Sequence, residues 1–129
     1  LPEGPHRDRL VGDIAEMARV VSRVLAAPVL DIRLDVTTGQ ACPKWHVDTV
    51  RARLLCTLRG PGTEFGPATP DGTPARIHRV PTGWAGLFRG FLWPGREVMG
   101  LVHRSPPARG SAAARLLLVL DPAEDAGTC

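Results

Sequence analysis

The spacing of apolar residues changes once along the chain, and this change limits the folds that the chain can adopt. Between residues 9 and 27, apolar side chains recur every three or four positions, which predicts one amphipathic helix. From Val29 onward, apolar residues instead form short runs separated by Gly and Pro, of which the sequence has 14 and 13. Ile32, Leu34 and Val36 alternate with charged residues, the pattern of a strand buried on one face. The chain is therefore expected to be mainly β with one N-terminal helix.

The apolar runs predict about six or seven short strands between turns. They are expected to form a double-stranded β-helix, a jelly-roll or cupin-like barrel, over residues 29–121. The helix, capped by Asp8 and ended by Pro28, is expected to pack outside the barrel. At 129 residues the chain suits one metal-binding domain, residues 1–129. The predicted strands are Val29 to Val36, Trp45 to Leu58, Arg76 to Val80, Trp84 to Arg89, Val98 to His103 and Arg115 to Asp121.

The distribution of charge disfavours some classes of partner. The formal net charge is +3, and only Lys44 among the 16 basic residues is a lysine. Acidic residues interrupt the arginines, so nucleic acid is not an expected partner, whereas an anionic small molecule is. The sequence has no apolar run long enough for a membrane span, and 3 cysteines are too few for a disulfide framework. A cytoplasmic protein is expected, and its oligomeric state is not predicted.

Two histidines and an aspartate have the spacing of a metal site. His46 and Asp48 flank one residue in a predicted strand, so both side chains are expected on the same face. His103 ends a later apolar run, which would bring it to the rim of the same sheet. Two imidazoles and one carboxylate form the facial triad that holds non-haem Fe(II), although zinc and manganese accept the same donors. The spacing therefore predicts that His46, Asp48 and His103 bind a metal ion.

Two arginines are predicted to bind a cosubstrate beside the metal. Arg115 begins the last predicted strand, where a bidentate pair could anchor a dicarboxylate cosubstrate. Arg53 is the second predicted contact. It shares a strand face with Arg51, and these two side chains either bind the same anion or form a solvated face.

Three further residues are considered as ligands. Cys42 precedes His46 closely enough to be an additional ligand, and a site with a thiolate would suit Zn(II). His78 could replace His103 as the third ligand. Cys56 lies in an apolar run and is expected to be a small buried residue instead. A closed shell that includes thiolate favours storage or structure, whereas an open face favours catalysis.

Several blocks of the sequence follow one another in an order that is typical of one family. These are Cys42-Pro43-Lys44-Trp45-His46-Val47-Asp48, Arg53-Leu54-Leu55-Cys56-Thr57, Gly60-Pro61-Gly62-Thr63-Glu64, Gly100-Leu101-Val102-His103-Arg104-Ser105-Pro106 and Arg115-Leu116-Leu117-Leu118-Val119-Leu120-Asp121. With them, residues 29–121 resemble the uncharacterised bacterial domain-of-unknown-function family 1826. The resemblance implies an association with zinc-limitation responses, and so a metal-handling or metal-replacing role.

A weaker similarity is to the Fe(II)/2-oxoglutarate oxygenases, and it is carried by His46, Asp48, His103 and Arg115. It implies Fe(II) with 2-oxoglutarate as cofactors, and a small molecule as substrate. The function expected from the sequence is therefore a metal-dependent oxygenase of this type. The alternative is a zinc-binding protein of metal homeostasis without catalytic activity.

Overall fold

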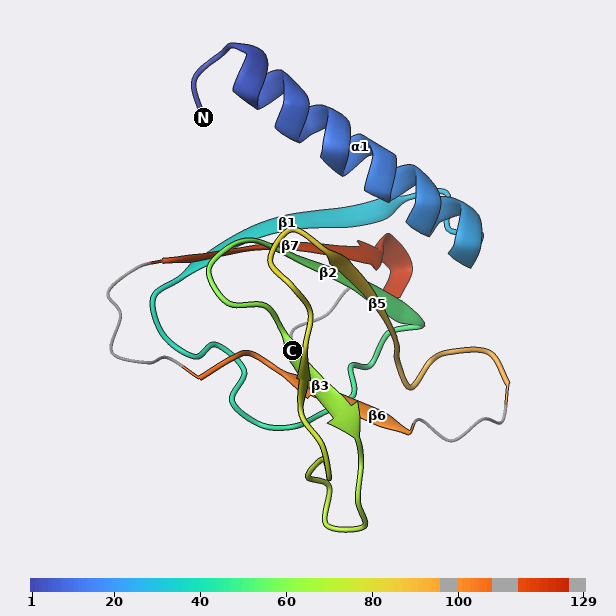
Figure 1. Cartoon of the computed structure of the whole chain (residues 1–129). Helices are drawn as coiled ribbons and strands as arrows, with labels where there is room; N and C mark the ends of the chain where they lie inside the picture. Colours follow the sequence, from blue (N-terminus) through green and yellow to red (C-terminus); the bar gives the residue numbers. More distant parts are fainter. Residues whose placement is uncertain (96–99, 108–113, 126–129) are drawn as a thin grey trace.

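The computed structural model of the protein describes residues 1–95, 100–107 and 114–125. In these ranges a long helix packs above two antiparallel sheets, which gives three layers (Figure 1). Within the described residues, no helix has the length and apolar character needed to span a membrane. The elements are α1 (Pro5–Leu25), β1 (Leu30–Thr37), β2 (Ala52–Arg59), β3 (Glu64–Pro67), β4 (His78–Arg79), β5 (Ala85–Arg89), β6 (Leu101–Arg104), β7 (Arg115–Pro122) and the short 3-10 helix η1 (Ala123–Asp125).

Helix α1 begins earlier than the apolar periodicity of residues 9–27 predicts. Pro5 lies in the first turn, where a missing backbone N–H costs nothing because that N–H has no partner within the helix. The predicted cap was wrong: Asp8 lies inside the first turn, where its carboxylate faces the positive end of the helix dipole. The helix ends at Leu25 because Ala26 adopts the left-handed conformation, with φ of 49°.

The larger sheet has the strand order β1-β7-β2-β5, and all neighbours are antiparallel. β1 pairs with β7 along its whole length, from Leu30 opposite Pro122 to Thr37 opposite Arg115. β1, β5 and β7 lie within one residue of the runs predicted for them. Their apolar residues occur at strand spacing, so local pattern located them correctly.

The smaller sheet has the order β4-β3-β6, and an isolated bridge between His46 and His103 extends it at the β6 side. The predicted strand from Trp45 to Leu58 was wrong in its first half, because β2 begins only at Ala52 and residues 45–51 form a loop. β3 was not predicted, since half of its residues are Gly and Pro, which have low strand propensity. Of the predicted strand from Val98, positions 98 and 99 lie outside the described residues.

The antiparallel pairs are nested along the chain. β1 pairs with β7, the His46 segment with β6, β2 with β5, and β3 with β4. The chain therefore runs as one long hairpin whose arms pair from the outside inward. The additional pairs β2 with β7 and β3 with β6 join these rungs into two sheets. The predicted closed barrel was wrong, because no pairing among the described strands connects one sheet to the other.

The main hydrophobic cluster lies between α1 and the larger sheet. Alternate residues of β2 and β7 point toward the helix, and each buried leucine among them contributes about 1.5–3 kcal/mol to folding. Cys56 is 2% exposed within this cluster, as predicted. The buried members are Val21, Leu25, Ala27, Ala52, Leu54, Cys56, Leu118 and Leu120.

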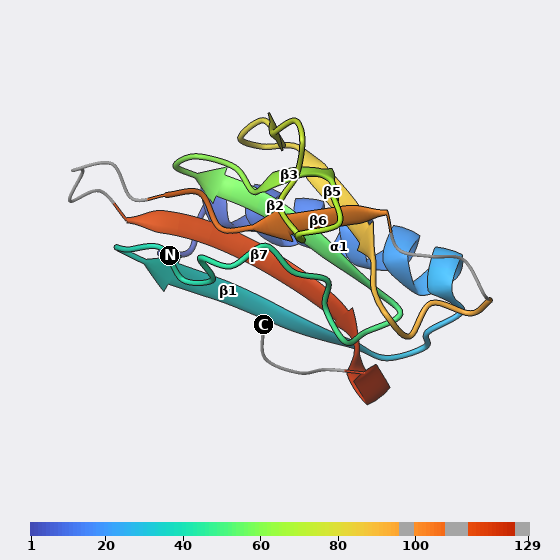
Figure 2. The ribbon, with the colours of Figure 1, turned by 90° about the horizontal axis from the view of Figure 1, so that it is seen from below.

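The opposite faces of the same two strands carry buried polar residues. Arg53 and Thr57 of β2, and Arg115 and Asp121 of β7, alternate with the core residues. They therefore face the smaller sheet, whose strands β3 and β6 lie in front of β2 and β7 when the molecule is seen from below (Figure 2). The register that builds the core thus also places these polar side chains between the sheets.

Candidate metal centre

The backbone brings His46 and His103 together. Each donates its N–H to the carbonyl of the other, at 3.0 Å in both cases. Two residues that exchange hydrogen bonds across an antiparallel bridge carry their side chains on the same face. The ring centroids of His46 and His103 are accordingly 4.5 Å apart. A single β-bridge therefore brings the two histidines together, where the sequence predicted a continuous strand.

Asp48 reaches the same place from a loop. Its backbone carbonyl accepts the N–H of Phe91 at 2.9 Å, and the carbonyl of Val50 accepts the N–H of Leu92 at 3.1 Å. Gly90 permits this approach, because a Cβ there would lie 2.1 Å from the Val50 oxygen and 2.6 Å from the Asp48 oxygen. The segment after β5 therefore fixes the loop that directs Asp48 at the histidines.

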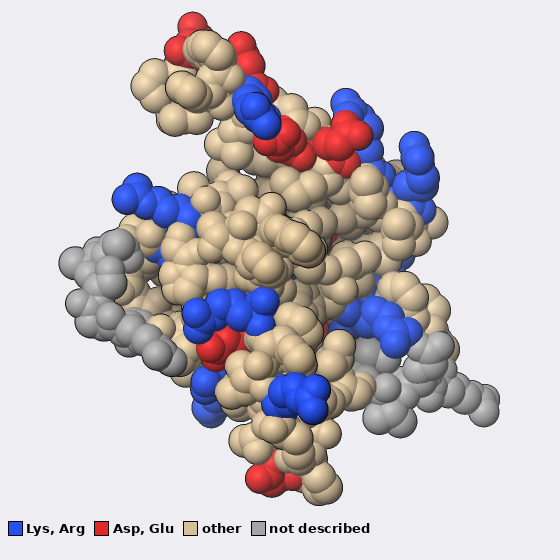
Figure 3. Space-filling model, in the orientation of Figure 1, with Lys and Arg blue, Asp and Glu red and all other residues tan. Residues whose placement is uncertain are grey.

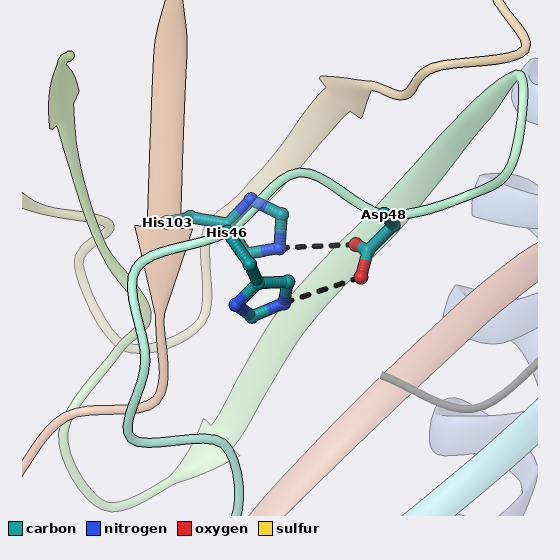
Figure 4. A group of neighbouring side chains, drawn as sticks. All are labelled: His46, Asp48 and His103. Atoms are coloured by element: carbon teal, nitrogen blue, oxygen red, sulfur yellow. Dashed lines mark ion pairs between the residues drawn. The ribbon is translucent and has the colours of Figure 1, made fainter. Parts of the chain in front are cut away.

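The three side chains form a compact group in which each ring points one nitrogen at a different carboxylate oxygen (Figure 4). Nε2 of His46 is 3.2 Å from Oδ1 of Asp48, and Nε2 of His103 is 3.0 Å from Oδ2. One ligand atom from each residue lies within 4.8 Å of the other two. Asp48 and His103 are each 5% exposed. The structure thus brings together the three residues that the sequence predicted as ligands.

The hydrogen bonds of His46 define which nitrogen faces the group. Nδ1 lies 2.7 Å from the carbonyl oxygen of Lys44, which can only accept, so Nδ1 carries the proton. In the neutral ring, Nε2 then presents a lone pair to Asp48. Two lone pairs at this distance repel each other unless a cation lies between them, and accordingly the carboxylate of Asp48 raises the pKa of His46. The group requires either a proton or a metal ion.

The alignment of the atoms fits a metal ion. Both carboxylate oxygens of Asp48 are buried, yet neither receives an aligned hydrogen bond. Buried carboxylate oxygens that have no hydrogen bond and lie beside two imidazole nitrogens are expected where a cation binds to these atoms together. Two ligand atoms about 2.1 Å from an ion, at right angles, are about 3.0 Å apart, and the observed separations are 3.0 and 3.2 Å. The donor set suits Fe(II), Mn(II) or Zn(II).

Asp48 contacts a buried ion pair formed by Arg53 and Asp121. The guanidinium of Arg53 lies 3.1 Å from Oδ1 of Asp48 and donates two hydrogen bonds, at 2.7 and 3.0 Å, to Asp121. Burial alone would raise the pKa of Asp48, but the two imidazoles and Arg53 hold it well below its usual range. Asp48 is therefore an ionised carboxylate. Arg53, predicted as a cosubstrate contact, is engaged with these two carboxylates.

Arg115 is buried among uncharged partners. Its Nε donates to the carbonyl of Pro61 at 2.9 Å, and one terminal nitrogen donates to the hydroxyls of Thr57 and Thr63, at 3.0 Å each. The side chain is 7% exposed, and burial lowers its pKa. No carboxylate pairs with it among the described residues. A buried cation without an anion is costly, so this position suits a bound anion.

One cavity of about 110 Å³ connects Arg115 to the metal-binding group. It lies between the sheets, and a cavity of this volume has room for several water molecules. Its apolar walls come from the larger sheet. The residues that line it include the three candidate metal ligands and the two buried arginines, namely His46, Asp48, His103, Arg53 and Arg115.

Three predicted residues stand apart from the group. His78 is exposed on β4 and stacks on Phe65, with ring centroids 5.4 Å apart. The third histidine or aspartate of the group is therefore His103 and not His78. Cys42 borders the cavity, but its sulfur is in a disulfide, a state without a thiolate for a metal. Arg51 binds Glu124 and Asp125 instead of the anion site.

Sequence reasoning missed the partners that hold the two buried arginines. Asp121 was recognised only as the end of a strand, and Thr57 and Thr63 were not considered. The available signal was a polar residue within an apolar run, as in Leu118-Val119-Leu120-Asp121. Such a residue must be paired when it is buried, but the run does not reveal its partner.

In the described residues, two antiparallel sheets lie beneath a long α-helix, and a histidine–aspartate–histidine group lies between the sheets. The chain belongs to the family described as "Protein of unknown function (DUF1826)", whose model matches residues 1–121. This match confirms the resemblance and extends it to helix α1. Neither the curated proteins nor the solved structures contain a match to the chain.

Proposed function

We propose that the protein is an Fe(II)- and 2-oxoglutarate-dependent oxygenase built on a double-stranded β-helix. The nested antiparallel pairs support the fold, because a jelly roll consists of two sheets made from two Greek keys. Seven described strands and the His46 segment supply eight positions, 7 + 1, that are divided equally between two sheets. The predicted cytoplasmic location stays a prediction.

Arg115 is the observation that carries the proposal. A metal store needs only its ligands. Arg115 lines the same cavity as the ligands, is buried, and pairs with no carboxylate among the described residues, so it calls for an anionic ligand. 2-Oxoglutarate has a carboxylate at each end. We assign its distal carboxylate to Arg115 and Thr63, and its 2-oxo acid end to the side of His46, Asp48 and His103.

The reaction proposed consumes one molecule each of substrate, 2-oxoglutarate and O₂. 2-Oxoglutarate loses CO₂ and becomes succinate, which takes one oxygen atom of O₂, and the other atom converts a substrate C–H bond into C–OH. When bound, Fe(II) supplies the one-electron chemistry that activates O₂.

The chain's own residues position the reactants and keep water out. Arg53 holds Asp48 in place, and Lys44 fixes the tautomer of His46 through its carbonyl. Leu55, Leu117 and Val119 form an apolar wall of the cavity, which shields the reacting atoms from solvent.

The alternative, a zinc-binding protein without activity, is favoured by the donor set alone. Its predicted fourth ligand, Cys42, would have to be released from its disulfide first. Zinc storage also gives no role to Arg115.

The decisive experiment is calorimetric titration of 2-oxoglutarate into the Mn(II)-loaded protein, because Mn(II) occupies the same donors without turnover. Binding is expected in the wild type. Hydrogen bonds to charged groups contribute about 1.5–3 kcal/mol, so Arg115→Gln should weaken binding at least about tenfold. Arg59→Gln is the matched control, since Arg59 is an exposed arginine of β2. The Fe(II) form with ascorbate as reductant should then produce succinate.

Two results would contradict the proposal. The first is that Mn(II)-loaded wild type does not bind 2-oxoglutarate. The second is equal binding by wild type and Arg115→Gln. Stoichiometric zinc retained through purification, together with either result, would favour the zinc-binding alternative.

A further inference from the structure

A second cavity, of about 450 Å³, adjoins the metal-binding group on the other side of His103. It lies between β5, at the edge of the larger sheet, and strands β4 and β6 of the smaller one. Its volume is in the range of sites that bind small organic molecules. His103 lines both this cavity and the smaller one that contains Arg115. A molecule in the larger cavity would therefore reach the metal site past His103.

The walls of this cavity are mainly apolar. Phe88 continues the apolar surface from His103, with ring centroids 4.8 Å apart, and Phe65 meets Phe88 edge to face at 5.9 Å. Trp84 and Leu101 complete the walls although they are 67% and 50% exposed. Exposed apolar side chains gathered around a hollow mark a binding site more often than isolated ones do. In Figure 3, the middle of the face on which β5 lies is largely without charged side chains.

The charged side chains among the described residues that line the cavity are basic. None of the described residues that line it is Asp or Glu. Two of the lining residues, Arg79 and Arg89, are basic. Glu64 binds Arg79 at 2.9 Å and Arg104 at 3.0 Å, so these three side chains carry a net charge of +1 (2 − 1). Among the described residues that line the cavity, a cationic ligand would find no carboxylate, whereas an anionic ligand would be attracted to Arg79.

We infer that this cavity binds the oxidised substrate, and that the substrate is a small anionic molecule with an aromatic or other apolar ring. The inference rests on the proposed function, which supplies the metal and the oxidation. The ring packs against Phe65, Trp84 and Phe88, the anionic group lies toward Arg79, and the carbon to be hydroxylated lies at His103.

The test uses 2-naphthoate as the probe, with 2-naphthylmethylammonium as a cation of the same shape and mannitol as a polar control. Titrations with metal-free protein are followed by the NMR signals of the probe. 2-Naphthoate is expected to bind at least about tenfold more tightly than the ammonium, and mannitol not at all. Absence of binding by 2-naphthoate, or equal binding of the cation, would overturn the inference.

Leu101→Asp places a carboxylate in the wall of the cavity. Because Leu101 is half exposed, the variant is expected to fold, and its affinity for 2-naphthoate should fall at least about tenfold. Val36→Asp is the matched control, since Val36 is 67% exposed on β1 and does not line the cavity. An equal loss in both variants, or no loss in Leu101→Asp, would contradict the assignment of the site.

A paramagnetic measurement separates this inference from the proposed function. Mn(II) bound at His46, Asp48 and His103 should broaden the signals of bound 2-naphthoate, and the effect should disappear in His46→Ala. Tight binding of the probe without broadening by bound Mn(II) would show that the cavity does not present its ligand to the metal, which overturns the substrate assignment. A separate titration detects whether Mn(II) binds at all. If it does not bind, the proposed function is contradicted, whereas the comparison of 2-naphthoate with the ammonium in metal-free protein still decides which class of ligand the cavity binds.

Discussion

Arg53 and Asp121 form a bidentate ion pair, at 2.7 and 3.0 Å, that is buried beneath Asp48. The guanidinium carries one positive charge and contacts two carboxylates, so neither Asp48 nor Asp121 can lose it without leaving a buried charge unpaired. The position of the candidate metal ligand thus depends on a residue pair that connects β2 with β7.

Arg53→Met should therefore destabilise the protein strongly. Removing one partner of a buried pair costs about 3–5 kcal/mol, measured as the free energy of unfolding in urea. Arg19→Met is the control, because Arg19 pairs with Glu16 on the exposed face of α1, where such a pair contributes at most about 1 kcal/mol. Similar losses in the two variants would show that the buried pair does not exist in solution.

Gly90 is the second residue on which the position of Asp48 depends. Gly90→Ala would place a Cβ 2.1 Å from the carbonyl oxygen of Val50, so the loop of Asp48 must shift. We expect a loss of about 1–3 kcal/mol in urea unfolding and weaker Mn(II) binding. Gly12→Ala is the control with the opposite sign: nothing lies within 4 Å of a Cβ in α1 at that position, so it should stabilise the helix. Unchanged Mn(II) affinity in Gly90→Ala would contradict this role.

Local patterns could predict the helix and the paired strands but not the loop that carries the metal ligands. His46 and Asp48 were correctly predicted to lie near His103. The predicted cause, a shared strand, was wrong, because residues 45–51 form a loop. The alternation around them suggested a strand, whereas the backbone contact of Gly90 with Asp48 and Val50 converts the segment into a loop. Such a contact joins residues far apart in sequence, and no local propensity reports it.

The supporting residues of the site were missed for a related reason. Asp121 at the end of an apolar strand gives no indication that Arg53 is its partner. Arg115 was predicted to bind an anion, and the structure adds that Thr57 and Thr63 hold it in place without neutralising it. The assignment of His46, Asp48 and His103 as ligands stays a prediction until a metal is measured.

Stability should fall in acid because of Glu64. Burial would raise its pKa, but the guanidinium groups of Arg79 and Arg104 lower it. A carboxyl group whose pKa is lower in the folded state stabilises the protein above its unfolded value, about 4.3, and the contribution is lost as the pH falls through the folded value. Urea unfolding between about pH 3 and 7 should show this slope, and Glu64→Gln should reduce it. The exposed Glu16→Gln is the control, and an equal slope in wild type and Glu64→Gln would contradict the prediction.

Metal binding should stabilise the folded protein only while both histidines are present. A ligand that binds the folded state alone adds about 2.7 kcal/mol when its concentration is one hundred times its Kd, so Mn(II) or Zn(II) should raise the Tm and a chelator should reverse the rise. His103→Ala should abolish this shift, because it removes one of three ligand atoms that lie within 4.8 Å of one another. His78→Ala is the matched control, since His78 is exposed on β4 of the same sheet and lies outside the group. A metal-dependent shift that survives in His103→Ala, or is lost equally in His78→Ala, would place the metal elsewhere on the protein.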